Sequence, residues 1–336
     1  MSYITPTNNR GKEILFLPNI FSEWVQLFFS QGIARSAVPI FFLFSAYLQA
    51  KKNDSYAILL KKRAKSLFLP FVLWTTIYVF YFSGLKLIIA KFAPNLLGHP
   101  ENTALSWIVL DWFHKILGYS FEKTDSLPEV AYHFWFIRDL MVLILISPVL
   151  KFLIRKFPVL FFAIVSVIYF YPIRIYFVEA QALFFYVAGL YWAIFDIPLF
   201  EKIDEIPWIE SILLFLIAFF ITHIFYEYNS TFGHFMVSFA CIISLKISGK
   251  IITNERLFSI LKYLAEFSFF LFAVHTPLLN AWIRKAWIFF FPMKNAFFCL
   301  FEYFGASILT ILIGTVIGIF CKKICPVLFK LLNGDR

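Results

Sequence analysis

Stretches of roughly 20 apolar residues recur along the chain, and the segments between them carry most of the charged residues. Each stretch is long enough to cross the hydrocarbon core of a bilayer as an α-helix. The pattern predicts about nine such spans. Their expected bounds are about 25–49, 67–90, 133–151, 158–176, 182–198, 209–226, 233–247, 264–283 and 304–321. The predicted fold class is all-α, a polytopic transmembrane helical bundle at 25–330 that follows an N-terminal segment, 1–24.

The composition supports this class. Of the 336 residues, 61% are hydrophobic and 15% charged, too apolar a chain for one soluble core. The formal net charge of +10 suits a nucleic-acid partner at first sight, but the basic residues cluster beside the apolar runs. In membrane proteins this clustering marks the cytosolic side. We therefore expect a lipid bilayer as partner and no nucleic acid.

The distribution of lysine and arginine predicts the orientation. Segment 51–65 is rich in both, as are the segments near 151–156, 246–262 and 322–336, whereas the long segment 91–131 is poorer. Because positive loops stay inside, segment 51–65 and the C-terminus are expected in the cytosol. Nine spans then leave the N-terminus outside, although no cleavable signal peptide is visible. This mismatch suggests one further helix before residue 1.

Charged residues at membrane depth are costly, so those present should line an interior site or have partners. Arg35 is either a cation in an interior site or an interfacial arginine that reaches the headgroups. Arg138 and Asp139 diverge by about 100° on a helix, which predicts different partners for the two. His275 is a candidate general base, and a hydrogen-bonded core histidine is the alternative.

Basic residues gather at 61–65, directly before an apolar span that begins with Pro70. Lys62, Arg63 and Lys65 at a cytosolic helix end can bind phosphates through charge-assisted hydrogen bonds. The alternative is that the run only marks the inside of the membrane.

Two other features of the sequence could indicate a metal site or a helix that covers a site. Cys321 and Cys325 lie one helical turn apart, but no histidine or third cysteine joins them, so no metal site is expected. Segment 91–131 contains an amphipathic helix pattern around 107–117. Such a helix lies in the outer interface, either as a lid over a site or passively.

An ordered set of motifs resembles the integral-membrane acyltransferase-3 family. The segment Val38–Leu48 is similar to V-P-x-F-F-x-x-S-G-Y-L, and Leu60–Pro70 to a basic helix start with R-x-x-R. Phe134–Leu140 resembles W-F-x-R-D-L, Phe185–Gly189 resembles F-x-x-x-G, and Ser268–Pro277 resembles S-x-x-x-x-x-x-H-x-P.

The resemblance implies a bacterial inner-membrane enzyme of ten helices. Such an enzyme moves an acetyl or other acyl group from cytosolic acyl-CoA to a hydroxyl of a cell-envelope or exported glycan or glycolipid. Arg63, with Lys62 and Lys65, would hold the CoA phosphates. Arg35, Arg138 and His275 would line the interior path or the acceptor site. No metal is implied.

Two departures from the family pattern matter. Ser66 stands at the second arginine of R-x-x-R. The family's first helix, with its presumed catalytic histidine, is not found, and no histidine precedes His99. The chain is therefore expected to be catalytically incomplete, through a misplaced start or a loss of activity. A transporter or flippase of glycan-lipid intermediates and a non-catalytic membrane scaffold are the alternative functions.

Overall fold

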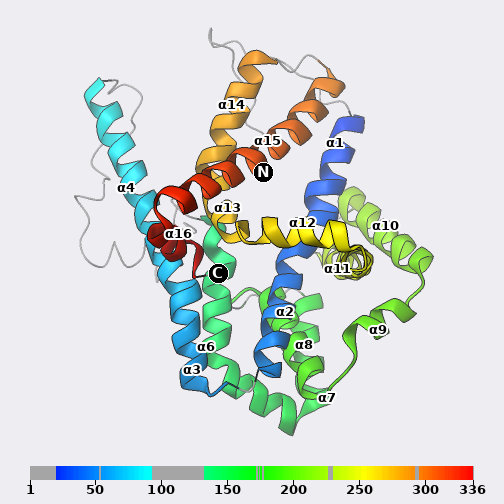
Figure 1. Ribbon diagram of the computed structural model, residues 1–336. Coiled ribbons are helices and arrows are strands. Elements are labelled where there is room, and N and C mark those ends of the chain that lie inside the picture. Colours follow the sequence, from blue (N-terminus) through cyan, green and yellow to red (C-terminus); the bar gives the residue numbers. More distant parts are fainter. Residues whose placement is uncertain are drawn as a thin grey trace.

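The computed structural model describes residues 20–52, 54–92, 132–171, 173, 175, 178–225, 230–291 and 295–335. Helices make up most of this part of the chain, and it contains no β-strand (Figure 1). The predicted all-α fold class is therefore confirmed. The interfacial helix expected within 91–131 lies outside the described residues, as does most of the segment 1–24.

The α-helices follow one another as α1 (Ile20–Leu27), α2 (Ala37–Lys51), α3 (Tyr56–Arg63), α4 (Leu69–Phe92), α6 (Trp135–Lys156), α7 (Pro158–Phe170), α8 (Ala180–Ile194), α9 (Leu199–Glu205), α10 (Trp208–Phe225), α11 (Thr231–Ile252), α12 (Glu255–Ala265), α13 (Ser268–Val274), α14 (Asn280–Phe290), α15 (Ala296–Ile324) and α16 (Pro326–Asn333). Short 3₁₀ turns, Ile33–Ser36 and Tyr132–Phe134, precede α2 and α6.

Five continuous helical segments are long and apolar enough to cross a membrane, and the bent pair of α12 with α13–α14 raises this to six. The chain is thus a multi-pass membrane protein. Every predicted span overlaps a helix, but α7 and α8 have only 13 and 15 residues. At about 1.5 Å per residue, both are shorter than a hydrocarbon core of about 30 Å. The count of nine spans stays a prediction.

Helices α2 and α8 form the most extensively packed pair of the bundle. Gly189 lets their backbones approach, because a Cβ at this position would lie 2.2 Å from the carbonyl oxygen of Leu43. The buried Tyr186 hydroxyl donates to Oε1 of Gln49 over 2.8 Å. The Nε2 of Gln49 in turn donates to the hydroxyl of Ser147 over 3.0 Å. Small residues and satisfied polar contacts of this kind join helices in membranes.

Charged side chains have partners both inside the bundle, where an unpaired charge is costly, and at its surface. Glu302 is 3% exposed and accepts a hydrogen bond of 2.5 Å from Nε of Arg284. Glu266 accepts from Lys322, also over 2.5 Å. The buried Lys246 donates to the carbonyl oxygens at the C-terminal end of α9.

π-Helical turns interrupt the helices at Phe28–Gly32, Ala64–Phe68 and His275–Leu279. A π turn pairs residues five apart and so shifts the face that the following side chains present. The first turn shortly precedes Arg35, the second directly follows Arg63, and the third begins at the candidate base. Such turns are frequent at functional sites.

The predicted span 264–283 falls mostly on the segment Ser268–Phe290, and its first residues belong to the end of α12. α12 and the segment Ser268–Phe290 meet at 52°. α12 exposes an apolar face that includes Leu257, Leu261 and Leu264, and it carries charges on the other side. An amphipathic helix of this kind suits a membrane interface. A hydropathy window averages over the bend and cannot separate the two parts.

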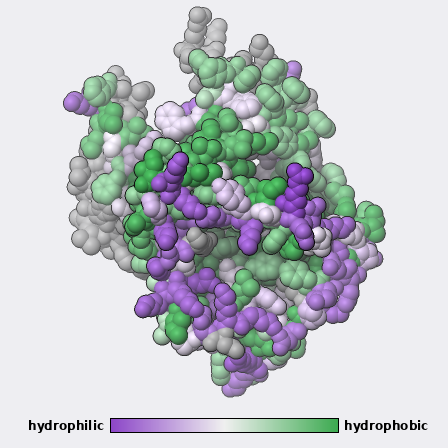
Figure 2. All heavy atoms as spheres, in the orientation of Figure 1, coloured by the Kyte–Doolittle hydropathy of each residue, from purple (hydrophilic) through white to green (hydrophobic). Residues whose placement is uncertain are grey.

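The surface divides by polarity (Figure 2). Hydrophilic residues gather in a band over α12 and α16 and in the lower part of this face, whereas hydrophobic residues cover the part above the band. Large hydrophobic side chains that face outward on α15 are exposed by 36–69%, as lipid-facing residues would be.

Candidate functional site

A cavity of about 320 Å³ opens at the end of the bundle where α2 leads into α3. We call it the basic cavity, since its wall contains four basic side chains and two carboxylates. It brings together the three residues predicted to bind phosphates. The residues that line it are Lys52, Asp54, Leu59, Lys62, Arg63, Lys65, Ser66, Gly334 and Asp335.

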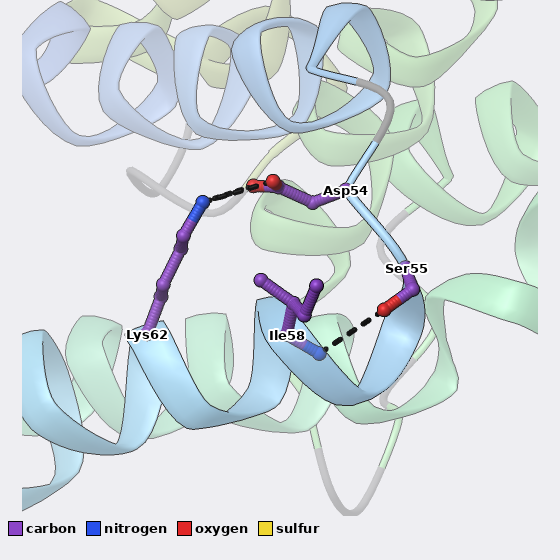
Figure 3. Close-up of polar contacts among 4 residues, drawn as sticks. All are labelled: Asp54, Ser55, Ile58 and Lys62. Atoms are coloured by element: carbon purple, nitrogen blue, oxygen red, sulfur yellow. Dashed lines mark hydrogen bonds and ion pairs between the residues drawn. The ribbon is translucent and has the colours of Figure 1, made fainter.

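The start of α3 forms one wall of the basic cavity. Figure 3 shows the polar contacts there. Ser55 is the N-cap residue, and its hydroxyl accepts the N–H of Ile58 at 3.5 Å. The two carboxylate oxygens of Asp54 lie 2.8 and 2.9 Å from Nζ of Lys62. This ion pair holds the Lys62 ammonium beside the loop that enters the helix.

Arg63 is the half-buried cation of the basic cavity. Within the described part of the chain it has no hydrogen-bond or ion-pair partner, although its charge interacts with Tyr186 and Asp54. A guanidinium that is partly removed from water gains most from a bidentate anion such as phosphate. The structure places this guanidinium in the wall of the basic cavity.

The C-terminal residues form another wall of the basic cavity. The Oδ2 atom of Asp335 lies 2.5 Å from Nζ of Lys65. The hydrogen bond and charge of Lys65 lower the pKa of Asp335, so its carboxylate is ionised at neutral pH. The sequence does not predict that residues 334–335 line this cavity, because only the fold brings them to the basic run.

His275 lines a second cavity, of about 370 Å³, between α13 and α15, which we call the histidine cavity. Its Nδ1 lies 2.6 Å from the carbonyl oxygen of Phe272. A carbonyl only accepts, so Nδ1 carries the proton of the neutral ring and Nε2 keeps a lone pair. The other lining residues are Ser268, Leu271, Phe272, Asn280, Ser307, Thr310 and Ile311.

Two polar rings from other helices accompany His275. The ring centroid of His133 lies 6.0 Å from that of His275, and the ring of Tyr78 lies 5.8 Å from that of His133. The Tyr78 hydroxyl donates to the carbonyl oxygen of Ala273 over 2.5 Å. Tyr78 thereby fixes the helix that carries His275 against α4. Neither His133 nor Tyr78 was predicted as a site residue.

Arg138 and Asp139 bind each other, so the expectation of different partners is wrong. Nε and Nη2 of Arg138 lie 3.1 and 3.0 Å from Oδ1 of Asp139. The other carboxylate oxygen accepts the N–H of Glu179, the N-cap residue of α8, at 2.9 Å. These contacts place Arg138 at the start of α8 and not among the residues that line the histidine cavity.

Arg35 occupies a third location. It is half-buried and interacts electrostatically with Tyr169 of α7 and His234 of α11, whose rings stack with centroids 4.5 Å apart. This position between helices favours the interior interpretation over the interfacial one. Arg35 lines neither the basic cavity nor the histidine cavity. The three candidate catalytic residues are thus in separate surroundings.

Metal ligation was not expected. In the described ranges, no three His, Cys, Asp or Glu side chains are grouped as a metal site would need. Cys321 and Cys325 are free thiols. The two cavities present cations at one end of the bundle and an imidazole between α13 and α15.

Comparison with known proteins identifies the family. A family model described as "Acyltransferase domain" (Acyl_transf_3) matches residues 14–321. The chain is also similar to the succinoglycan biosynthesis protein ExoH of Rhizobium meliloti (strain 1021), with 24% identity over 335 residues, covering 94% of this chain and 83% of the relative. No solved structure matches. Because the family model covers most of the chain, the protein belongs to the acyltransferase-3 family and is a membrane acyltransferase.

Proposed function

We propose that the protein transfers an acyl group, acetyl in the simplest case, from cytosolic acyl-CoA to a hydroxyl of a cell-envelope or exported glycan. The observation that supports this most is the basic cavity. Four cations line a space of about 320 Å³ that is open to solvent at one end of a membrane bundle. Coenzyme A presents phosphates, the groups that such cations bind most strongly.

At the donor end, Arg63 takes the main role. Among the described residues, neither it nor Lys52 has an ion pair, whereas Lys62 and Lys65 each have a carboxylate partner, and of the two unpaired cations only Arg63 is half-buried. A planar guanidinium can bind two phosphate oxygens at once, which orients the nucleotide end of CoA. The lysines add positive charge around it.

At the acceptor end, we assign the general base to His275, in place of the histidine that the family pattern carries on its first helix; this assignment is the alternative to a catalytically incomplete chain. The Nε2 lone pair of His275 takes the proton of the acceptor hydroxyl while the hydroxyl oxygen attacks the thioester carbonyl carbon. A C–O bond forms, the C–S bond breaks, and the CoA thiolate leaves and takes up a proton. His133 and Tyr78 position the imidazole ring and its helix.

The acceptor class is supported by the relative. ExoH is named for succinoglycan biosynthesis, and succinoglycan is a polysaccharide. A polysaccharide hydroxyl fits the polar groups of the histidine cavity, which include the hydroxyls of Ser268, Ser307 and Thr310. We place the chain in the bacterial inner membrane, with the basic cavity and the C-terminus in the cytosol, where positive loops reside.

The test uses the full chain in lipid nanodiscs with radiolabelled acetyl-CoA and a glycan acceptor. Arg63→Ala should raise the KM for acetyl-CoA roughly 10- to 100-fold, the value of a charge-assisted hydrogen bond. Arg155→Ala is the matched control, because Arg155 is an exposed arginine on α6 that does not line the basic cavity. It should leave the KM unchanged.

Four other outcomes bear on the conclusion. Equal KM values for both variants would contradict a donor site at Arg63. Glycan-lipid movement without acyl-CoA would favour a flippase, and silence of Arg63→Ala and Arg138→Ala in every assay would favour a scaffold. CoA binding without transfer would keep the donor site and agree with a catalytically incomplete chain.

A further inference from the structure

The last helix carries the C-terminal residues into the basic cavity. α16 packs on α4, where Nε1 of Trp74 donates to the carbonyl oxygen of Leu332 over 3.0 Å. The chain then turns at Gly334, whose φ of +76° is in the left-handed region. A Cβ at Gly334 would lie 2.4 Å from the carbonyl oxygen of Ser66, so glycine is needed for this close approach. The turn delivers Asp335 to Lys65.

Buried hydrogen bonds fix this tail independently of Asp335. The side chain of Asn333 is fully buried. Its Nδ2 donates to the carbonyl oxygen of Glu266 over 2.8 Å, and its Oδ1 accepts the N–H of Phe270 at 3.1 Å. Both ends of the amide are thus satisfied by backbone groups between α12 and α13. The carboxylate of Asp335 is therefore not needed to hold the tail in place.

The Lys65–Asp335 pair is weak enough to exchange. Its side chains are 65% and 40% exposed, and exposed ion pairs contribute little net free energy. A phosphate carries more charge and more acceptor oxygens than a carboxylate, so it competes well for the same ammonium. Asp54 forms a similar ion pair with Lys62 on the other wall of the basic cavity.

We propose that Asp335 is a resident counter-ion of the donor site, which pairs with Lys65 when the basic cavity is empty and yields it to a phosphate of acyl-CoA. This inference rests on the proposed donor site. It assigns the C-terminal residues a part in setting donor affinity: the carboxylate competes with the donor for one cation. The exchange involves no covalent step.

The experiment measures CoA affinity by titration of the full chain in nanodiscs. Asp335→Asn removes the competing charge and keeps the size of the side chain, so CoA should bind roughly two- to five-fold more tightly. Asp335→Glu should stay near the wild-type value. Asp196→Asn is the matched control, because Asp196 also forms an exposed pair with a lysine, Lys51, but does not line the basic cavity.

A double-variant cycle separates competition from a structural role. In a Lys65→Met background the Asp335→Asn change should have no effect, since the contested cation is absent. An unchanged or weaker affinity of Asp335→Asn, or the same gain in the Lys65→Met background, would overturn the inference while leaving the donor site intact. A wild-type chain that binds no CoA would instead overturn both proposals.

Discussion

At the residue scale, the orientation of one imidazole decides what the interior of the bundle can do. His275 directs Nδ1 at the carbonyl oxygen of Phe272, and its ring borders the histidine cavity. Nδ1 is therefore used for positioning, and Nε2 is the nitrogen that can take a proton.

Glutamine at position 275 should abolish transfer without affecting donor binding. It has a polar end but cannot accept a proton at neutral pH, so kcat should fall by roughly 10²- to 10⁴-fold while CoA affinity stays unchanged. Rates come from transfer assays and affinities from titration. His223→Gln is the control, because Nδ1 of His223 lies 2.8 Å from the carbonyl oxygen of Phe219 in the same manner, on α10. Full activity of His275→Gln would rule out the general base.

The sequence predicted which side chains share a cavity better than it predicted which side chains bind each other. Lys62, Arg63 and Lys65 do share one cavity, as their spacing indicated. The prediction for Arg138 and Asp139 failed because helical spacing fixes only the directions of the Cβ atoms. The long arginine side chain reaches the carboxylate of its neighbour, and the other oxygen of that carboxylate accepts the N–H of Glu179 at the start of α8.

At the element scale, the α2–α8 contact depends on the glycine of the F-x-x-x-G motif. Gly189→Ala should destabilise the protein by about 1–3 kcal/mol, because the new methyl group meets the backbone of Leu43 and not a movable side chain. Thermal unfolding followed by tryptophan fluorescence measures this.

Gly249→Ala provides the control for Gly189→Ala. Gly249 lies in α11 with nothing within 4 Å of a Cβ placed there. The change should be neutral or stabilise the helix by up to about 1 kcal/mol. Equal losses at the two positions would mean that Gly189 acts through helix propensity and not through close packing.

Helix existence followed from the apolar runs, but helix shape did not. Each span predicted from hydropathy overlaps a helix of the structure. Hydropathy did not reveal the bend of 52° between α12 and α13. It also missed the π turns at Ala64–Phe68 and His275–Leu279. Neither feature changes the average hydropathy of a window, and both depend on packing between distant segments.

At the scale of the whole molecule, the long helix α15 connects the two ends of the bundle, of which only one is basic. α15 has 29 residues, about 43 Å at 1.5 Å per residue, and joins the region of Phe291 to the basic end at Cys325. Because basic ends remain in the cytosol, the two residues should be accessible from opposite sides of the membrane.

Labelling with a membrane-impermeant maleimide tests this orientation. Cys325 is exposed, so it should react in inside-out vesicles and not in right-side-out ones. In a Cys325→Ser background, Phe291→Cys should show the reverse pattern. Phe291 is 45% exposed, which makes it a suitable position. Labelling of Cys325 from the outside would invert the assigned topology.

The basic cavity as a whole was beyond prediction from the sequence. The basic run was evident, but Gly334 and Asp335 are remote from it along the chain and carry no motif. Their role arises from the packing of α16 on α4 and from the two hydrogen bonds of Asn333. Long-range contacts of this kind leave no periodic signal.

The same remoteness has a consequence for biosynthesis. A ribosome synthesises the chain from its N-terminus at roughly 5–20 residues per second. Lys62 and Lys65 are therefore synthesised many seconds before Asp335. The cavity wall that Gly334 and Asp335 provide is therefore the last part of the cavity to be synthesised. A nascent chain that has not yet reached residue 334 holds these cations without their second carboxylate, and the cavity is complete once residues 334 and 335 have been added.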